Sequence, residues 1–332
     1  MKNKIALDLG SSFTKIYKAG ADVVLCEPTV IAIENGNYRK PLAVGFEAEK
    51  LIGKTGDSVK IIRPVKNCEI VDEKALTALL LAFIKKIKSG FELNPDVLFS
   101  VQCGSDREVI KKFEKVLNNA GLYNIDYAEN PLLCLLGTYA PITETTGCAV
   151  IDFGGEQTTV CVLTLGGVIS GVSMAFGGNK LNSMIIKHIE ENLKLSISLT
   201  QAEILKNQIA SLINEDDTKT VINGRDVLTG KTRSTQILAS EIALPVKNFV
   251  DKVIEITNMI FKKLPQEALL EIKKNGIYIT GGGSKLYGIE DYLSFALGYD
   301  VVGADERDIA CIIGGGIAIE DKNLLNKIKL KL

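Results

Sequence analysis

The chain has 332 residues, of which 46% are hydrophobic and 24% charged. This length predicts about two domains, and the composition excludes an intrinsically disordered chain. The 39 Lys and Arg residues nearly balance the 40 Asp and Glu residues, so no basic field exists to attract nucleic acid. The single histidine, His188, excludes a His-rich metal site and argues against a His-based catalytic triad.

In chain order, the hydrophobic pattern predicts short strands that alternate with amphipathic helices. We expect strands at 5–7, 15–17, 30–33, 42–44, 97–101 and 276–280, and helices at 75–88, 107–120 and 181–189. This alternation is typical of an α/β fold. His188 falls on the apolar face of the last of these helices, where it is expected to be a core or boundary residue.

The cysteines and the first residues of the chain indicate the cellular compartment in which the protein is expected. The seven cysteines include no C-x-x-C pair, and most have aliphatic neighbours, which is typical of buried free thiols in a reducing cytosol. The first expected strand begins at Ile5 and leaves no room for a signal peptide. The longest strongly apolar run, 75–84, is half of what a bilayer span needs. We therefore expect a soluble, cytoplasmic protein.

The most informative feature is an internal repeat. Residues 5–16 read Ile-Ala-Leu-Asp-Leu-Gly-Ser-Ser-Phe-Thr-Lys-Ile, and residues 149–160 read Ala-Val-Ile-Asp-Phe-Gly-Gly-Glu-Gln-Thr-Thr-Val. Each copy is an apolar strand ending in Asp-x-Gly, then a tight turn of small residues, then a second strand. A hairpin that occurs twice in one chain indicates two similar domains.

The repeated turns have the chemistry of a metal–phosphate site. A carboxylate at a strand end, Asp8 in one copy and Asp152 in the other, can hold a hydrated Mg²⁺. The small residues of the turn let backbone N–H groups approach phosphate oxygens, and Lys15 can add a positive charge.

A third glycine-rich segment, 281–283, follows the expected strand at 276–280. Three consecutive glycines allow a flat group such as a nucleobase or ribose to lie against the backbone. The spacing is not that of a P-loop, because the next lysine, Lys285, comes too soon, and it does not match the G-x-G-x-x-G fingerprint.

These three segments together resemble the superfamily of actin, sugar kinases and heat-shock-chaperone ATPases. Within it, segments 26–33, 42–48, 61–66, 202–206 and 222–230 resemble the MreB family of bacterial actin homologues, and the resemblance runs from about residue 4 to residue 320. It implies a two-domain actin-like ATPase fold of class α/β, in which each domain has a larger and a smaller subdomain and the two domains close over ATP–Mg²⁺.

The resemblance also implies where the domains and the functional residues lie. Domain I would comprise 1–146 and 318–332, with a small subdomain at about 33–69. Domain II would comprise 147–317, with a small subdomain at about 181–240. The metal would be held through water by Asp8 and Asp152, and catalysis would involve Asn130, Asp152 and Thr158. The expected ATP contacts are Asp8, Gly10, Ser11, Ser12, Phe13, Lys15, Gly154, Gly155, Glu156, Gln157, Glu203, Lys206, Gly281, Gly282, Gly283, Ser284 and Lys285.

Three of these positions depart from the family pattern. Glu156 replaces a glycine beside the expected triphosphate, where two like charges about 4 Å apart repel by roughly 1–4 kcal/mol. If that position needs positive φ, a residue other than glycine adds roughly 1–3 kcal/mol of strain. Gln157 replaces a threonine near the attacking water. Asn130 replaces the glutamate that activates this water in the family, and an amide cannot accept the proton of the water as a carboxylate can. Nucleotide binding is therefore expected, and fast hydrolysis is not.

Three hypotheses for function remain open. The first is a nucleotide-binding, filament-forming cytoskeletal protein with slow or absent hydrolysis, and the small net charge leaves little repulsion against such self-association. The second is a degenerate actin-like scaffold that has lost its nucleotide. The third is a small-molecule kinase of the same fold, which is disfavoured because no substrate-side catalytic aspartate can be recognised.

The MreB resemblance also implies peripheral attachment to the inner face of the cell membrane. Phe91 and Leu93 fall where the family carries its apolar membrane loop. An apolar turn that packs on its own domain would show the same sequence pattern. The C-terminal segment 322–332 alternates lysines with aliphatic residues, which is typical of a solvated last helix and also suits anionic lipid.

Overall fold

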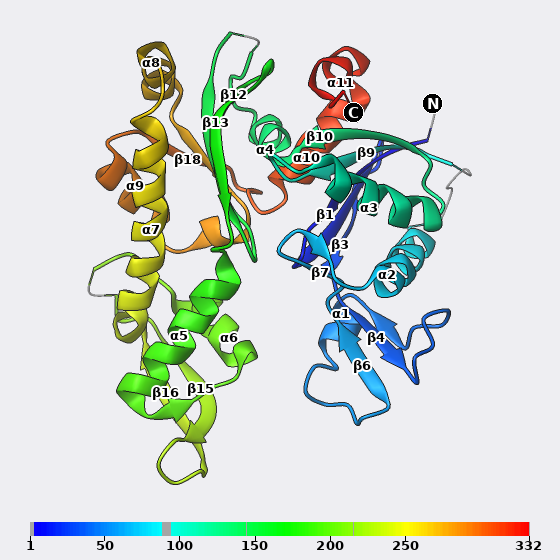
Figure 1. The fold of residues 1–332 in the computed structure, drawn as a ribbon. Helices are drawn as coiled ribbons and strands as arrows, with labels where there is room; N and C mark the ends of the chain where they lie inside the picture. The colour runs from blue at the N-terminus through cyan, green and yellow to red at the C-terminus, as the bar shows by residue number, and fades with distance from the viewer. Residues whose placement is uncertain (1–2, 88–93, 144, 215, 332) are drawn as a thin grey trace. The chain divides into compact units, whose positions relative to one another are not determined.

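Two groups of elements, unit 1 and unit 2, make up the computed structural model, which describes residues 3–87, 94–143, 145–214 and 216–331. Unit 1 comprises Met1–Gly147, Leu163–Val168 and Ile309–Leu332, and unit 2 comprises Cys148–Val162 and Ile169–Asp308 (Figure 1). The expected membrane residues Phe91 and Leu93 lie outside the described residues.

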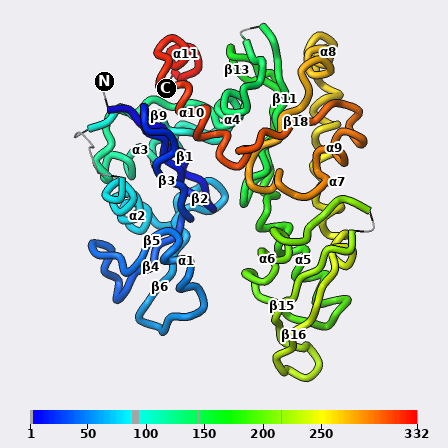
Figure 2. The backbone as a smooth tube through the Cα atoms, turned by 180° about the vertical axis from the view of Figure 1, so that it is seen from behind, coloured from blue at the N-terminus to red at the C-terminus, as the bar shows by residue number. Residues whose placement is uncertain are grey.

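Unit 1 is built on a five-stranded sheet of order β10-β9-β1-β2-β3. Its central strand β1 has five consecutive buried residues, which is typical of a strand covered on both faces. β9 and β10 run parallel to β1, with helix α3 between them in sequence, whereas β2 and β3 continue as an antiparallel meander. Helix α10, the last but one in the chain, lies against β1 and packs on α4 (Figure 2).

The elements of unit 1 have the following bounds. The strands are β1 Lys4–Leu9, β2 Phe13–Lys18, β3 Asp22–Pro28, β4 Ile31–Glu34, β5 Ala43–Val44, β6 Val59–Ile62, β7 Val65–Lys66, β8 Glu69–Ile70, β9 Asp96–Val101 and β10 Asn124–Glu129. The helices are α1 Phe46–Glu49, α2 Glu73–Lys86, α3 Arg107–Asn119, α4 Asn130–Gly137, α10 Ala310–Glu320 and α11 Lys322–Ile328.

Unit 2 repeats this plan with a sheet of order β13-β12-β11-β17-β18 and adds a small sheet β14-β15-β16. Its strands are β11 Cys148–Phe153, β12 Thr158–Thr164, β13 Gly167–Met174, β14 Leu195–Ser196, β15 Lys219–Asp226, β16 Thr232–Leu238, β17 Ile277–Thr280 and β18 Val301–Gly303. Its helices are α5 Gly178–Leu193, α6 Leu199–Ile209, α7 Ala243–Phe261, α8 Gln266–Asn275 and α9 Ile289–Leu297, with the 3₁₀ turns η1 Ala239–Ile242 and η2 Gly282–Lys285.

The two main sheets have the same strand order. β1, β2 and β3 correspond to β11, β12 and β13, and the parallel strands β9 and β10 correspond to β17 and β18. The repeated Asp-x-Gly hairpin joins the first two strands in each sheet, and this confirms the expectation of two similar domains. The subdomain limits at 33–69 and 181–240 stay predictions. Helix α10 belongs to unit 1, which takes up the chain again at Ile309, before the expected boundary at residue 318.

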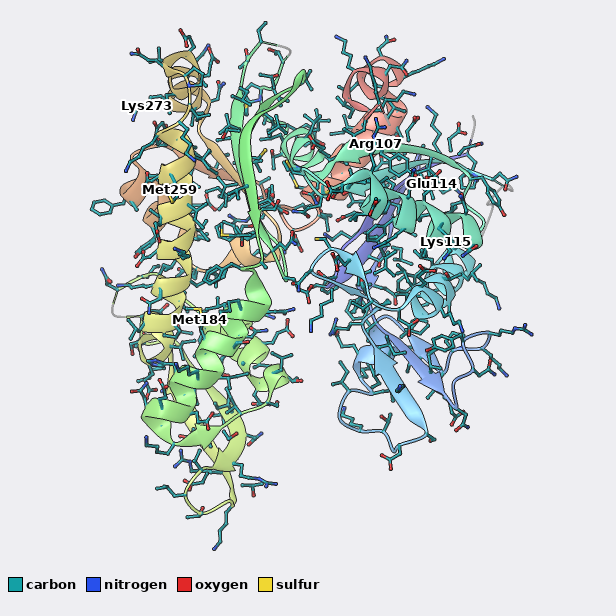
Figure 3. All side chains as sticks on the ribbon, viewed as in Figure 1. Arg107, Glu114, Lys115, Met184, Met259 and Lys273 are labelled. Atoms are coloured by element: carbon teal, nitrogen blue, oxygen red, sulfur yellow. The ribbon has the colours of Figure 1, made fainter. Side chains whose placement is uncertain are left out.

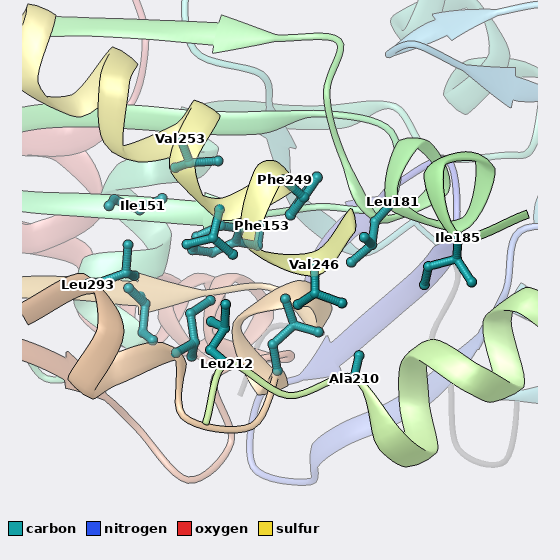
Figure 4. Close-up of a cluster of buried hydrophobic side chains, with 14 of the residues drawn as sticks. Ile151, Phe153, Leu181, Ile185, Ala210, Leu212, Val246, Phe249, Val253 and Leu293 are labelled. Atoms are coloured by element: carbon teal, nitrogen blue, oxygen red, sulfur yellow. The ribbon is translucent and has the colours of Figure 1, made fainter. Parts of the chain in front are cut away.

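Each unit has its own hydrophobic core. In unit 2 the inward residues of β11, among them Ile151 and Phe153, pack against Phe249 and Val253 of α7 (Figure 4). Leu181 of α5 belongs to the same cluster. His188, on the same helix, is half-buried and its Nε2 lies 2.8 Å from the Glu241 carbonyl oxygen, as expected for a boundary residue.

The outer faces of the helices carry the charged side chains. Arg107, Glu114 and Lys115 lie along α3 in Figure 3, and the Lys115 ammonium lies 2.7 Å from the Glu73 carboxylate at the start of α2. Such exposed pairs contribute only about 0–1 kcal/mol each. In the described part of the chain, no helix combines the length and the apolar character that crossing a membrane requires.

The cysteines are all free thiols, but their burial is uneven. Cys134, Cys148, Cys161 and Cys311 are buried, as expected, whereas Cys26 is exposed. Burial raises the pKa of the Cys148 thiol to about 11, so this thiol stays protonated at neutral pH.

Candidate functional site

The first turn, residues 10–13, joins β1 to β2. Asp8 at the end of β1 lies directly opposite Lys15 in the antiparallel ladder, and the Lys15 ammonium donates to Asp8 Oδ2 at 3.3 Å. Ser100 on the neighbouring strand β9 donates to the other carboxylate oxygen at 3.5 Å. Asp8 is buried, so the turn has one carboxylate and one ammonium fixed at its base.

A backbone hydrogen bond between the ends of the first turn closes it. The Gly10 amide donates to the Phe13 carbonyl oxygen at 3.0 Å, and a Cβ at Gly10 would lie 3.0 Å from that oxygen. Ser11 and Ser12 are half-buried, whereas the Phe13 ring is exposed and packs edge-on against Phe46. The turn therefore has the small, tight backbone that was expected of a phosphate-binding segment.

The second loop, residues 154–157, is the matching segment of unit 2. Asp152 at the end of β11 accepts a hydrogen bond of 2.9 Å from the buried Thr280 hydroxyl of β17. The Gly154 and Gly155 carbonyls accept from the amides of Gly178 and Asn179 at 3.0 and 2.7 Å. The loop is thereby fixed to the first residues of α5, whose orphan N–H groups it satisfies.

The residues that depart from the family pattern fit this loop without backbone strain. Glu156 is not among the described residues with positive φ, so the strain expected for that case does not arise. Gln157 Oε1 is buried and has no hydrogen-bond partner among the described residues. The charge of Glu156 is therefore what distinguishes this loop from its glycine-rich counterpart.

The structure gives each expected catalytic side chain a local partner. Thr158 is fully buried and its hydroxyl donates to the Phe176 carbonyl oxygen at 2.6 Å. Asn130 begins α4, and its Oδ1 accepts from the Cys134 thiol at 3.3 Å. The adjacent carboxylate, Glu129, accepts from the Gly104 amide at 3.3 Å. The catalytic assignments of Asn130, Asp152 and Thr158 stay predictions.

A pocket of about 540 Å³ lies within unit 2. Four of the residues expected to contact a nucleoside line it, namely Lys206, Gly282, Gly283 and Lys285. The expected contacts Glu203, Gly281 and Ser284 are not among its lining residues. Its other walls are Gly178, Leu181, Asn207, Gln208, Ile209, Ala210, Ser211, Asp216, Thr218, Phe249, Leu286 and Tyr287.

The two lysines of this pocket differ in their surroundings. The Lys206 side chain is only 13% exposed, and its ammonium lies 3.8 Å from the Glu203 carboxylate. Burial lowers the pKa of Lys206, and the nearby Glu203 opposes that shift. The Lys285 ammonium lies 2.8 Å from Asp308 and is half-exposed. Lys206 is therefore the buried cation of the pocket.

Asp216 and Tyr287 are among the lining residues that the sequence did not indicate. Hydrogen bonds from Thr218 and Ser211 lower the pKa of the Asp216 carboxyl, so the pocket wall carries an anion at neutral pH. Tyr287 reaches the pocket because Ser211 and Tyr287 form a β-bridge, in which the Leu212 amide donates to the Tyr287 carbonyl. No local pattern predicts this pairing between segments that are distant in the chain.

The donor chemistry suits Mg²⁺ held through water. Asp8 and Asp152 each offer carboxylate oxygens, which this cation prefers. Within the described ranges, no group of three or more His, Cys, Asp and Glu side chains could hold a metal ion directly. Each of the two carboxylates is a group that can accept hydrogen bonds from the water shell of such a cation.

Comparison with known proteins gives a consistent result. The family model described as MreB/Mbl protein matches residues 2–327. The cell shape-determining protein MreB of Escherichia coli (strain K12) is 30% identical over 324 residues, which cover 96% of this chain and 93% of that protein. The cell shape-determining protein Mbl of Bacillus subtilis (strain 168) is 28% identical over 328 residues, or 98% of each chain.

Solved structures show the same architecture. MreB5 of Spiroplasma citri bound to AMPPNP superposes with a TM-score of 0.89 at 25% identity, covering 99% of this chain and 98% of that one. The ADP-bound form gives a TM-score of 0.91. The MamK double helical filament, at 16% identity and a TM-score of 0.79, shares the fold.

Proposed function

Because the chain belongs to the MreB/Mbl family and has its actin-like fold, we propose that it binds ATP with Mg²⁺ and assembles with copies of itself into cytoskeletal filaments that direct cell shape. The pocket of unit 2 carries this proposal. Its 540 Å³ volume is within the range of small-molecule sites, and it combines a glycine-lined wall with a buried lysine.

The residues of the site take separate roles in this proposal. The glycine wall at Gly282 and Gly283 accommodates the nucleoside, and Lys206 supplies a positive charge beside it. In unit 1, the amides of the first turn and Lys15 bind phosphate oxygens. Mg²⁺, held through water by Asp8 and Asp152, would neutralise phosphate charge.

Slow or absent hydrolysis follows from the groups near the expected water. A general base must be within hydrogen-bond reach of the proton that it removes. Asn130 has an amide in place of a carboxylate, and the neighbouring Glu129 carboxylate is oriented toward the Gly104 amide, from which its Oε1 accepts at 3.3 Å. The Thr158 hydroxyl is buried and donates to Phe176. Phosphate release from ATP is measured for the wild-type chain and for a Glu129→Gln control. Release by wild type that is no faster than release by the control would support slow hydrolysis, and clearly faster release would contradict it.

Nucleotide would control assembly by differential binding. A ligand shifts a conformational equilibrium only if it binds one state better than the other. We propose that ATP favours the state that assembles. Similar proteins support this: MamK forms a double helical filament, and MreB5 of Spiroplasma citri binds AMPPNP and ADP.

Peripheral membrane attachment is a separate part of the proposal. Phe91 and Leu93 are apolar residues at the family's membrane-loop position, and two buried side chains contribute roughly 3–6 kcal/mol at best. A filament multiplies such weak contacts. Flotation with liposomes containing anionic lipid should fall for the Phe91→Ser/Leu93→Ser variant, and equal flotation of both proteins would remove this segment as the anchor.

Titration calorimetry with ATP–Mg²⁺ tests the nucleotide site directly. The wild-type chain should bind ATP with one site per chain, and Lys206→Met should weaken that binding. Absence of ATP binding by the folded wild-type chain would instead favour a degenerate scaffold that has lost its nucleotide.

A further inference from the structure

Thr29, which follows β3, contacts the first turn at two points. Its hydroxyl lies 2.7 Å from the Gly10 carbonyl oxygen, and its backbone amide donates to the Ser12 carbonyl oxygen at 2.9 Å. A second buried hydroxyl, that of Thr14, lies 2.9 Å from the Thr29 hydroxyl. Both threonines are 0% exposed.

The direction of this hydrogen-bond chain is fixed by its last member. A carbonyl oxygen only accepts, so the Thr29 hydroxyl must donate its proton to Gly10. The Thr29 oxygen is then left as the acceptor for the Thr14 hydroxyl. The chain therefore runs from Thr14 to Thr29 to Gly10, and every donor in it has one acceptor.

This arrangement orients the peptide groups of the turn. In a planar trans peptide, the N–H points away from the preceding C=O. Because the Gly10 and Ser12 carbonyls both point to Thr29, the amides of Ser11 and Phe13 point away from it. These are the amides of the turn that the proposed function assigns to phosphate.

The second loop is fixed in a corresponding way by different groups. Gly154 aligns with Gly10 in the repeat, and its carbonyl accepts from the Gly178 amide at 3.0 Å. Thr158 aligns with Thr14, and its hydroxyl donates to Phe176. In each unit the segment that follows the third strand thus holds the carbonyl of the first glycine. Unit 1 uses a side-chain hydroxyl where unit 2 uses the backbone.

We propose that Thr29 is a positioning residue for phosphate binding, which holds the amides of the first turn in the orientation that phosphate requires and is itself oriented by Thr14. The inference rests on the proposed nucleotide function but names a residue outside the expected contacts. It gives the buried hydroxyl pair a role beyond filling the interior, because a valine fills the same volume and cannot hold the Gly10 carbonyl.

The test compares Thr29→Val with Thr29→Ser, which keeps the hydroxyl. Thr257→Val is the matched control, since Thr257 is also 0% exposed and donates a hydrogen bond of 2.8 Å to a carbonyl within α7. Amide hydrogen exchange is measured without nucleotide at Gly10, whose amide donates to the Phe13 carbonyl and closes the turn. ATP and adenosine affinities are then measured by calorimetry or by competition.

Thr29→Val should raise exchange of the Gly10 amide by about tenfold and weaken ATP binding by about tenfold, because a buried acceptor loses its donor. Adenosine affinity should stay unchanged, and Thr29→Ser should restore both readouts to within about twofold. Thr14→Val, which keeps the bond to Gly10, should give a smaller change in the same direction. Thr257→Val should leave exchange in the turn and the ratio of ATP to adenosine affinity as in wild type.

Unchanged exchange of the Gly10 amide in folded Thr29→Val would overturn the inference, as would an equal loss of ATP and adenosine affinity. If wild-type protein binds no ATP, the proposed function fails. The exchange comparison, which needs no nucleotide, then still decides whether Thr29 holds the turn.

Discussion

The Lys206 ammonium lies 3.8 Å from the Glu203 carboxylate at the wall of the unit 2 pocket, although the lysine side chain is only 13% exposed and the glutamate side chain 50%. Because so much of the partner is in solvent, it offsets only part of the desolvation of the lysine. A buried cation of this kind is costly in the free protein and becomes favourable when an anionic ligand arrives.

This cost gives Lys206→Met opposite effects on stability and binding. At neutral pH the variant without nucleotide should melt about 2–4 °C above wild type, the shift that roughly 1 kcal/mol produces in units of this size. ATP affinity should fall about tenfold or more, because a hydrogen bond to a charged group is lost. Calorimetry of both proteins, with and without ATP, measures the two effects.

The stability difference should also depend on pH. The pKa of Lys206 is lowered from its ordinary value of 10.5 in the folded state. The unfolded chain therefore binds more protons between the two pKa values, and wild-type stability rises with pH across that window. The excess stability of nucleotide-free Lys206→Met should thus shrink as the pH approaches 10.5, and a constant difference would contradict the burial of this charge.

Lys15→Met should weaken binding of phosphates specifically. The change removes the ammonium 3.3 Å from Asp8, so ATP affinity should fall about tenfold while adenosine affinity stays the same. Lys115→Met is the matched control, because it removes another lysine of an ion pair from unit 1, on the outer side of α3 (Figure 3). Equal affinities of Lys15→Met and Lys115→Met for ATP would remove Lys15 from the site.

Glu156→Gln should tighten ATP binding. If the carboxylate lies about 4 Å from phosphate oxygens, its removal relieves roughly 1–4 kcal/mol of repulsion, and at least about a fivefold gain is expected. The gain should be larger for ATP than for ADP, which carries one phosphate fewer. Glu190→Gln, on the exposed face of α5, serves as the control. Weaker binding by Glu156→Gln would show that the carboxylate supports the site.

Two neighbouring glycines should respond differently to substitution. A Cβ at Gly282 would meet nothing within 4 Å, and this residue lines the pocket. Gly282→Leu should therefore keep its melting temperature and lose at least about tenfold in nucleotide affinity. Gly281 has φ of +81°, and a Cβ there would lie 2.4 Å from the Phe153 carbonyl oxygen. Gly281→Ala should instead introduce about 1–3 kcal/mol of backbone strain and so lower the melting temperature by several degrees. The reverse pattern in thermal melts and titrations would contradict the pocket wall described above.

The repeat made much of the fold predictable. An Asp-x-Gly turn between two apolar strands is a local pattern, and its second copy indicated two sheets of the same order. The pocket lysine and the glycine wall could also be predicted from the sequence, because Lys206 and Gly282 lie in segments that resemble the family. The uneven burial of the cysteines could not be predicted, since Cys26 directly follows three aliphatic residues of β3 and is nevertheless exposed.

The remaining features depend on contacts between distant segments. Nothing in the sequence near Thr29 indicates that its hydroxyl reaches Gly10, and nothing near Asp216 indicates a pocket wall. The backbone angle of Glu156 could not be predicted either. A glutamate in place of a glycine is strained only if φ is positive, and the structure shows that it is not.

Sedimentation with and without ATP–Mg²⁺ tests most directly the claim that nucleotide binding drives self-assembly. The wild-type chain should pellet substantially more with ATP–Mg²⁺ than without nucleotide, and Lys206→Met should reduce the difference. An equal pelleted fraction under both conditions, for a chain shown to bind ATP, would contradict nucleotide control of assembly.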